Sequence, residues 1–298
     1  MTRTCGQGRR GVLRGAAALV AASVAGAVRG DPARADQIPS AARAGHGRLK
    51  QSVSRWCFGK MSLDELASHA VRIGYQGIDL LGPDEWAAVR KHGLICPMAM
   101  LGAPVTIDKG LNRVENHAPI LDALRKGIDL AAEAQVPNLV CFSGNRAGMS
   151  DAEGLDNCAR GLVQVAGHAE KKGVTLCVEL LNSKVDHKDY MCDHTAWGVA
   201  LVKKVGSPRV KLLYDIYHMQ IMEGDVIRTI RENVDSIAHF HTAGVPGRHD
   251  IDGSQELNYG AVCRAIAETG YKGFVAQEFV PAGDPLRALE EAFRICDV

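Results

Sequence analysis

The chain has 298 residues, of which 46% are hydrophobic and 23% are charged, and its formal net charge is +1. This composition is typical of a soluble globular protein, and the length suits one large domain or two small ones. The near-neutral charge gives no electrostatic case for a nucleic-acid partner.

The first 35 residues have the features of an export signal. Arg9 to Arg14 resembles a twin-arginine motif, an apolar run follows from Ala16 to Val28, and Ala33 to Ala35 fits a cleavage site before Asp36. The apolar run is too short to span a bilayer comfortably. We therefore predict a twin-arginine signal peptide over residues 1–35, a periplasmic location and no stable membrane association after cleavage. A disordered basic tail and an uncleaved anchor are the alternatives.

The signal also holds most of the positive charge. Residues 1–35 carry six arginines and one aspartate, so the rest of the chain has 29 basic and 33 acidic residues and is mildly acidic. Nine cysteines are present, and they form no C-x-x-C pair. The sequence alone therefore establishes no disulfide framework.

Residues 36–48 show no periodicity and are interpreted as a linker. From Leu49, short apolar strands alternate with amphipathic helices, and this pattern predicts a single domain over residues 49–298. The predicted strands are Val53–Phe58, Gly77–Leu81, Ile95–Leu101, Asn138–Phe142, Thr175–Leu180, Val210–Asp215, Ile237–Thr242 and Phe274–Phe279. The predicted helices run over about Ser62–Ile73, Asp84–His92, Glu115–Gln135, Ser150–Lys172, Asp193–Val205, Gly224–Asn233, Tyr259–Thr269 and Asp284–Cys296.

Eight strand–helix units in about 250 residues are the number and length of a (β/α)8 TIM barrel. A doubly wound open sheet is the competing architecture. We favour the barrel because the unit count is eight and no glycine-rich phosphate fingerprint opens the first helix. In either architecture, ligands bind at the C-terminal ends of the strands.

Four of the predicted strands end in a residue that could bind a metal. Glu179, Asp215, His241 and Glu278 each follow or interrupt an apolar run. One such acid is more often an ion-paired or capping residue, but three acids and a histidine in successive strands indicate a shared site. Carboxylate and imidazole ligands suit Mn²⁺, Mg²⁺ or Co²⁺, and the imidazole disfavours pure Mg²⁺ chemistry.

Three further residues lie near these strand ends. His239 shares a face with His241, because positions two apart in a strand point the same way, and we interpret it as a satisfied core residue one layer deeper. His218 follows Asp215 closely and is a candidate substrate contact, with a structural hydrogen bond as the alternative. Arg248 lies in the long loop after the seventh strand and is a candidate clamp for a substrate carboxylate.

Four long segments carry a family resemblance. Tyr214–Asp225 (YDIYHMQIMEGD), Thr229–His241 (TIRENVDSIAHFH), Val245–Asp250 (VPGRHD) and Glu256–Tyr259 (ELNY) resemble the hydroxypyruvate isomerase family, which belongs to the xylose isomerase-like TIM barrels. The resemblance is strongest from Thr175 to Pro281, extends more weakly back to Leu49, and does not cover the signal.

The resemblance implies roles for the candidate residues. A divalent metal is held by Glu179, Asp215, His241 and Glu278, and the two glutamates also serve as the acid/base pair. His218 and Arg248 match positions that contact substrate. The implied reaction interconverts hydroxypyruvate and tartronate semialdehyde by proton transfer through an enediolate. The implied partner is a small hydroxy-carbonyl or sugar substrate, and the reading is compatible with a homo-oligomer.

One departure from the family pattern keeps other functions open. Hydroxypyruvate isomerases tend to have glutamine at the third ligand position, whereas His241 is similar to the ketose 3-epimerases. A ketose 3-epimerase is therefore one alternative, and a non-catalytic exported sugar-binding barrel is another. A DNA-repair endonuclease on the same barrel is disfavoured by the mildly acidic body and the export signal.

Overall fold

A computed structural model describes residues 47–298 of the chain. The predicted signal peptide, and all but the last two residues of the predicted linker, lie outside the described residues, so both stay predictions. The described residues belong to one compact unit. Among them, no helix combines the length and the apolar character that crossing a membrane requires.

The strands are β1 (Lys50–Ser54), β2 (Gly77–Asp79), β3 (Met98–Ala99), β4 (Asn138–Cys141), β5 (Thr175–Leu180), β6 (Val210–Asp215), β7 (Ile237–Thr242) and β8 (Phe274–Gln277). The α-helices are α1 (Leu63–Ile73), α2 (Trp86–Arg90), α3 (His117–Glu133), α4 (Asp151–Lys172), α5 (Thr195–Val205), α6 (Ile216–Met222), α7 (Val226–Asn233), α8 (Tyr259–Glu268) and α9 (Pro285–Cys296). Short 3-10 helices are η1 (Arg55–Phe58), η2 (Val114–Asn116) and η3 (Val234–Ser236).

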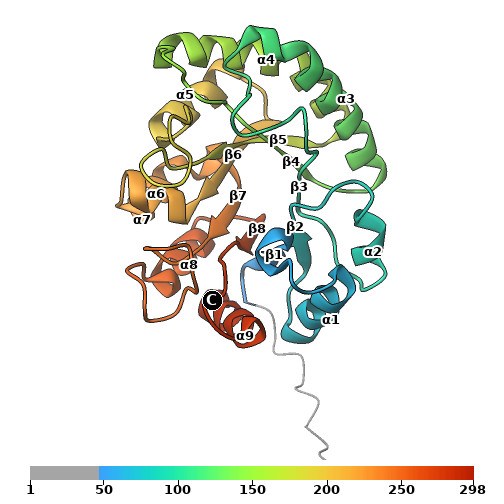
Figure 1. Ribbon diagram of the computed structural model, residues 1–298, viewed down its shortest axis with the longest axis vertical. Coiled ribbons are helices and arrows are strands. Elements are labelled where there is room, and N and C mark those ends of the chain that lie inside the picture. The colour runs from blue at the N-terminus through green and yellow to red at the C-terminus, as the bar shows by residue number, and fades with distance from the viewer. Residues whose placement is uncertain (1–46) are drawn as a thin grey trace, which may run out of the picture. The chain divides into compact units, whose positions relative to one another are not determined.

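The strands form one parallel sheet that closes on itself. Their order is β2-β1-β8-β7-β6-β5-β4-β3, and parallel bridges from Gly77 to Ile95 and from Leu81 to Ala99 join β2 to β3. Figure 1 shows the helices around the outside of these strands. The predicted (β/α)8 barrel is confirmed for the described residues.

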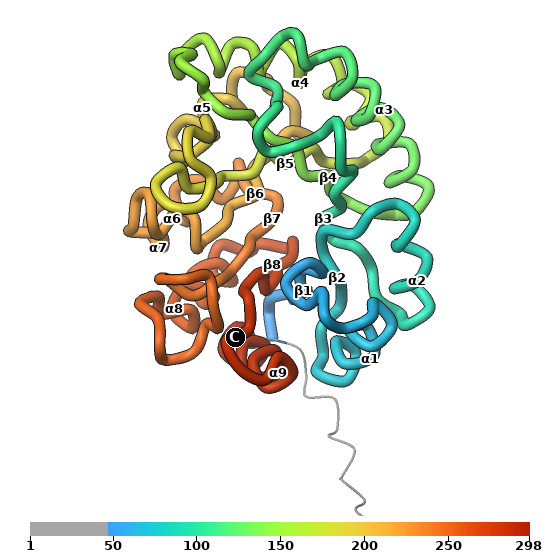
Figure 2. The backbone as a smooth tube through the Cα atoms, viewed as in Figure 1, coloured from blue at the N-terminus to red at the C-terminus, as the bar shows by residue number. Residues whose placement is uncertain are grey.

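The two ends of the barrel domain meet. The backbone N–H of Gly47 donates to Asp297 Oδ1 at 2.6 Å, and that of Arg48 donates to the Val298 carbonyl at 2.7 Å. Figure 2 shows α9 returning beside α1, where the chain path of the barrel began. This contact completes the ring of helices around the sheet.

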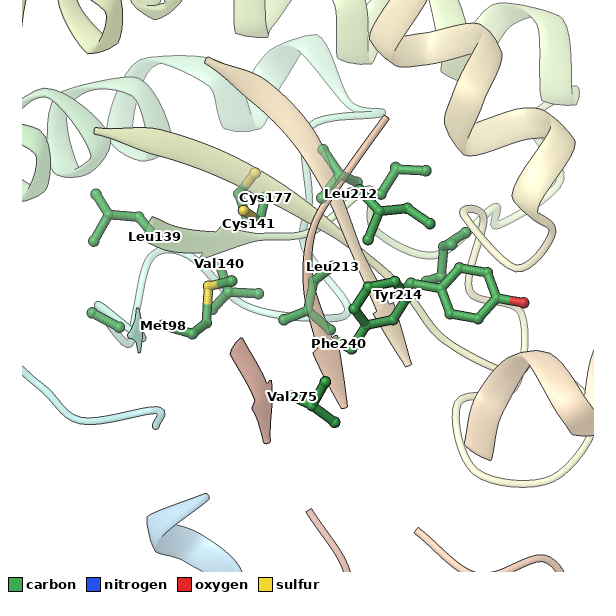
Figure 3. Packing of buried hydrophobic residues seen from close by; sticks show 14 of the residues in the cluster. Met98, Leu139, Val140, Cys141, Cys177, Leu212, Leu213, Tyr214, Phe240 and Val275 are labelled. Carbon is green, nitrogen blue, oxygen red and sulfur yellow. The ribbon is translucent and has the colours of Figure 1, made fainter. Parts of the chain in front are cut away.

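Apolar side chains from neighbouring strands fill the space within and around the sheet. Figure 3 shows this packing on β3 to β8, where Met98, Val140, Cys177, Leu213 and Phe240 are among the buried side chains. Because the strands are buried on both faces, they read as near-continuous apolar runs in the sequence. A polar side chain inside such a run therefore marks a place with a specific partner or function.

Register brings the strand ends to one level. Asp215 on β6 pairs with His241 on β7, and Glu179 on β5 pairs with Leu213, two residues before Asp215. The backbone N–H of Glu278 donates to the carbonyl of Thr242 at 2.9 Å, which fixes the residue after β8 against β7. The same register therefore carries the four candidate ligands toward a common position.

The predicted start of the first helix is confirmed. Ser62 is the N-cap of α1, its Oγ accepts the backbone N–H of Glu65 at 3.2 Å, and the Glu65 carboxylate accepts the N–H of Ser62 at 2.8 Å. This reciprocal pair satisfies two backbone donors that the helix itself leaves free. The helix ends at Ile73 and is followed by Gly74, whose φ of 122° lies where glycine is favoured.

We expect Ser62→Ala to lower the free energy of unfolding by about 1 kcal/mol, because the variant loses this cap. Urea denaturation monitored by circular dichroism measures the change. Ser62→Asp is the matched control, since aspartate retains a capping acceptor and should keep wild-type stability. Equal stability of the alanine variant and the wild type would show that the cap contributes nothing.

Two strand predictions were wrong in extent. The first strand is Lys50–Ser54 rather than Val53–Phe58, because the chain turns into the 3-10 helix η1 at Arg55. The third strand is only Met98–Ala99 rather than Ile95–Leu101. Pro97 lies inside the longer predicted run, and proline lacks the N–H that a strand ladder needs.

Two helix predictions also need correction. The helix predicted to begin at Asp193 begins at Thr195 with His194 as its N-cap, because the Asp193 carboxylate is bound by Arg146 at 2.9 Å instead. The prediction placed no helix directly after β6, yet α6 follows Asp215 at once. The remaining predicted boundaries differ from the observed ones by at most about two residues, as expected at frayed ends.

Candidate active site

The four predicted metal ligands come together. Glu179 on β5, Asp215 at the end of β6, His241 on β7 and Glu278 just after β8 each offer a ligand atom within 4.8 Å of the others. All four side chains are buried. The structure thus joins residues that lie up to about a hundred positions apart in the sequence, at the C-terminal ends of four neighbouring strands.

Two of these side chains carry atoms without a hydrogen bond. His241 Nδ1 lies 2.7 Å from Glu278 Oε2 and 3.7 Å from Glu179 Oε1, yet it forms no hydrogen bond with any residue in 47–298. Asp215 Oδ2 likewise lacks a hydrogen-bond partner in that range. Buried polar atoms left without partners are costly. Their convergence on one spot fits a cation that they would share.

The other oxygen of Asp215 has a structural task. Asp215 Oδ1 accepts the backbone N–H of His218 at 3.2 Å and so caps α6. The cap holds the carboxylate at the strand–helix junction and leaves Oδ2 directed toward the other ligands. Asp215 therefore both caps the start of α6 and provides one candidate metal ligand.

Arg248 also reaches the site, from the loop after β7. Its Nη2 lies 2.8 Å from Glu278 Oε2 and 3.5 Å from Asp215 Oδ2. The guanidinium stacks over Trp56, 5.1 Å from the ring centroid, and over Tyr217 at 5.4 Å. These contacts place the predicted carboxylate clamp next to the candidate ligands, although its role stays a prediction.

Trp56 was missed by the sequence analysis. It lies in η1, directly after β1, and its Nε1 donates to Glu278 Oε1 at 2.7 Å. Its ring is nearly half exposed at the mouth of the site. The sequence feature that could have identified Trp56 is its position near the end of a strand. An aromatic residue there is usually part of the core, and tryptophan carries no titratable group.

Three carboxylates, an imidazole and a guanidinium are crowded together in the site. Burial, the largest cause, raises the pKa of Glu179, and it raises the pKa of Asp215 to about 8 against the opposing charge of Arg248. Burial acts the same way on Glu278, but His241 and Arg248 outweigh it and hold the pKa of Glu278 well below its usual range. Burial opposes the cationic form of His241, but the surrounding carboxylates raise its pKa well above normal. A divalent cation would relieve this crowding of carboxylates.

His218 lies behind the site wall. It is fully buried, its Nδ1 contacts Asn182 Nδ2 at 2.7 Å, and its Nε2 lies 3.5 Å from Asp215 Oδ2. Burial lowers its pKa well below the normal value, so the ring is neutral near pH 7. The structural hydrogen bond considered for His218 is therefore present, and its predicted contact with substrate stays a prediction. His187 packs edge-to-face against it, 5.2 Å between ring centroids, and lines the cavity.

A cavity of about 270 Å³ opens above the cluster. This volume suits a small ligand, below the size typical of drug-sized sites. Its polar walls are Glu179, Glu278, Arg248 and His187. Its apolar walls are Trp56, Leu80, Met100, Ile107, Phe142 and Leu181. Both candidate acid/base glutamates therefore face the space in which a small substrate would bind.

A second polar layer lies below the site. His239 is fully buried and its Nε2 contacts Asp79 Oδ2 at 2.5 Å, in agreement with its interpretation as a satisfied core residue. Burial alone would raise the pKa of Asp79, but His239 and His241 outweigh it and lower the value. Asp79 was not predicted, although it shows the same signal as the ligands, an acid ending an apolar strand.

The chain is similar to several known proteins. Residues 67–296 match the family described as xylose isomerase-like TIM barrel. A putative hydroxypyruvate isomerase of Danio rerio is 28% identical over 228 residues, which cover 76% of this chain and 79% of that protein. A 2-oxo-tetronate isomerase of Cupriavidus necator is 36% identical over 120 residues, 40% of this chain and 45% of that protein.

Among solved structures, an AP endonuclease, family 2, from Brucella melitensis has a TM-score of 0.72 with the chain. The two are 24% identical, and the likeness covers 81% of this chain and 96% of that one. At this identity the likeness concerns the fold alone.

Proposed function

Because the chain belongs to the xylose isomerase-like TIM barrel family, we propose that it is a metal-dependent isomerase acting on a small hydroxy-carbonyl compound. Hydroxypyruvate, converted to tartronate semialdehyde, is the substrate we propose first. The names of the curated relatives support this class of reaction, since they include hydroxypyruvate isomerase and 2-oxo-tetronate isomerase. Family membership itself was expected from the sequence and is confirmed.

One observation carries the proposal. Two glutamates, an aspartate and a histidine from four strands converge within 4.8 Å, and both glutamates line a cavity of small-molecule size. A purely structural ion-pair cluster has no need to face a cavity, and perturbed carboxylates in a cavity are a recognised mark of an active site.

The cation would be held by Glu179, Asp215, His241 and Glu278. Oxygen donors with one imidazole suit Mn²⁺, Co²⁺ or Mg²⁺. When bound, it supplies Lewis-acid polarisation of the carbonyl and stabilises negative charge on the two adjacent oxygens. Support for this fit comes from Asp215 Oδ2 and His241 Nδ1, which have no hydrogen-bond partner among the described residues.

The two glutamates would move the proton. One of Glu179 and Glu278 takes a proton from the hydroxymethyl carbon, and the other delivers a proton to the adjacent carbon that was the carbonyl. A proton also passes between the two oxygens, so the hydroxyl and the carbonyl exchange places and the atoms balance. A carboxylate placed in this way contributes about 10²- to 10⁴-fold over water.

Arg248 would hold the carboxylate of the substrate. It lines the cavity, and its guanidinium lies beside the candidate ligands, with Nη2 2.8 Å from Glu278 Oε2. Guanidinium and carboxylate groups form strong, often bidentate, hydrogen bonds. Stacking between Trp56 and Tyr217 restricts the plane of the guanidinium, which favours a single orientation of the bound anion.

An NMR assay in deuterated water tests the proposal. Purified protein loaded with Mn²⁺ converts hydroxypyruvate, and the product is analysed for deuterium at carbon after removal of the paramagnetic ion. Product with deuterium at the carbon that receives the proton supports the isomerase. A ketose 3-epimerase, which His241 at the third ligand position favours, would instead exchange one ketose proton and invert that carbon. Binding without exchange for any compound of a hydroxypyruvate, 2-oxo-tetronate and ketose panel would indicate a non-catalytic barrel.

We expect Trp56→Phe to lower kcat/KM by about tenfold, because it removes the indole N–H that Glu278 accepts while retaining an aromatic face for Arg248. A hydrogen bond to a charged group contributes about 1.5–3 kcal/mol, and partial exposure places this bond at the low end. Steady-state kinetics measures the loss. Trp197→Phe is the matched control, since its Nε1 donates to the Asp151 carbonyl instead. Equal losses in both variants would contradict the assignment.

A further inference from the structure

The layer beneath the proposed cation site contains a carboxylate shared by two histidines. Asp79, at the end of β2, lies with its Oδ2 2.5 Å from His239 Nε2 and 3.4 Å from His241 Nε2. All three side chains are completely buried. β2 and β7 are not neighbours in the sheet, since β1 and β8 lie between them. The contact therefore crosses the interior of the barrel.

The two nitrogens of His241 face opposite environments. Nδ1 lies 2.7 Å from Glu278 Oε2, on the side of the candidate ligands, whereas Nε2 faces Asp79. Neither nitrogen has a hydrogen bond that meets geometric criteria among the described residues. A neutral imidazole binds a cation through one nitrogen and carries its proton on the other. If Nδ1 is the ligand atom, the proton must be on Nε2.

A negative charge beside Nε2 favours that arrangement. A carboxylate within about 4 Å stabilises a proton on the nearby nitrogen, and carboxylates of this kind commonly orient metal-bound histidines. His239 fixes the position of Asp79, because its Nε2 donates to the same oxygen. The rings of His239 and His241 lie edge to face, with centroids 5.2 Å apart, which limits the rotation of both.

We propose that Asp79 is a positioning residue for His241. It holds the proton on Nε2 and the orientation of the ring, so that Nδ1 stays directed at the shared cation position. His239 acts with it by anchoring its carboxylate. The inference rests on the proposed function to the extent that it requires a cation bound by His241, but it assigns a role to two residues outside the ligand set.

Cation affinity provides the first test. Metal-stripped wild type and Asp79→Asn are titrated with Mn²⁺ in a calorimeter, and we expect the variant to bind 10- to 100-fold more weakly. Asn has the same shape but presents a neutral amide to the two histidines. Asp64→Asn is the matched control, because it removes a carboxylate from the surface pair with His92, 2.6 Å long, and should leave the affinity unchanged.

A folded Asp79→Asn variant with wild-type Mn²⁺ affinity would overturn the proposal. Circular dichroism establishes that each variant is folded. If wild type itself binds no divalent cation, the proposed function fails as well. If wild type and variant bind Mn²⁺ equally well, only the role of Asp79 fails, so the two outcomes can be told apart.

A second measurement on wild type needs no variant and can overturn the proposal even if Asp79→Asn does not fold. In Mg²⁺-loaded protein with ¹⁵N-labelled histidine, we expect the His241 proton on Nε2 and a proton-free Nδ1. A proton on Nδ1 would overturn the proposal, whatever the behaviour of Asp79→Asn.

Discussion

Glu278→Gln should reduce turnover by at least about 10³-fold while the protein remains folded. Glutamine has the same size and shape but accepts no proton at neutral pH, so one half of the proposed acid/base pair is lost. The change also removes the charge that His241 Nδ1 and Arg248 Nη2 face at 2.7 and 2.8 Å. Deuterium incorporation and steady-state turnover of the substrate accepted by wild type measure the effect.

A control separates this chemistry from the loss of a surface charge. Glu290→Gln removes an exposed carboxylate that pairs with Arg72 at 3.4 Å, and it should keep wild-type turnover. Mn²⁺ affinity of Glu278→Gln divides the two roles of the residue. If Mn²⁺ binding is retained and turnover is lost, the role of Glu278 is proton transfer. If Mn²⁺ binding is lost, its role is chiefly to bind the cation. Normal turnover by Glu278→Gln would refute both roles.

The parts of the fold that were predictable are those buried on both faces. The strands Thr175–Leu180, Val210–Asp215 and Ile237–Thr242 have the predicted limits. Each is buried along almost its whole length, so apolar residues recur throughout it. The first and third strands were predicted too long. Pro97 was a sequence signal against the longer third strand, whereas the turn into η1 at Arg55 depends on where neighbouring strands stop pairing, which a single sequence does not show.

The candidate site was predictable for a related reason. An acid or histidine that interrupts an apolar strand is costly without a partner, so Glu179, Asp215, His241 and Glu278 were visible from composition and position. Trp56 was not, because its importance lies in a bond to Glu278, 222 residues away. Asp79 was overlooked because the strand was predicted to continue to Leu81, whereas the structure ends it at Asp79.

Removal of divalent cations should abolish turnover and lower the melting temperature. Without the cation, three buried carboxylates are opposed chiefly by His241 and Arg248, and Asp215 Oδ2 has no hydrogen-bond partner in the described part of the chain. A ligand present at about 100 times its Kd stabilises the native state by about 2.7 kcal/mol. For a domain of about 250 residues, that corresponds to a shift of about 5–10 °C.

Differential scanning fluorimetry with and without a chelator measures this shift, and readdition of Mn²⁺ should restore both stability and turnover. Asp215→Asn is the informative comparison. This variant loses one ligand charge while its side-chain oxygen can still cap α6 at the N–H of His218. Its melting temperature should therefore respond much less to the chelator than that of wild type. If the chelator changed neither the turnover nor the melting temperature of wild type, the site would not bind a functional cation. The convergence of three carboxylates there would then need another explanation.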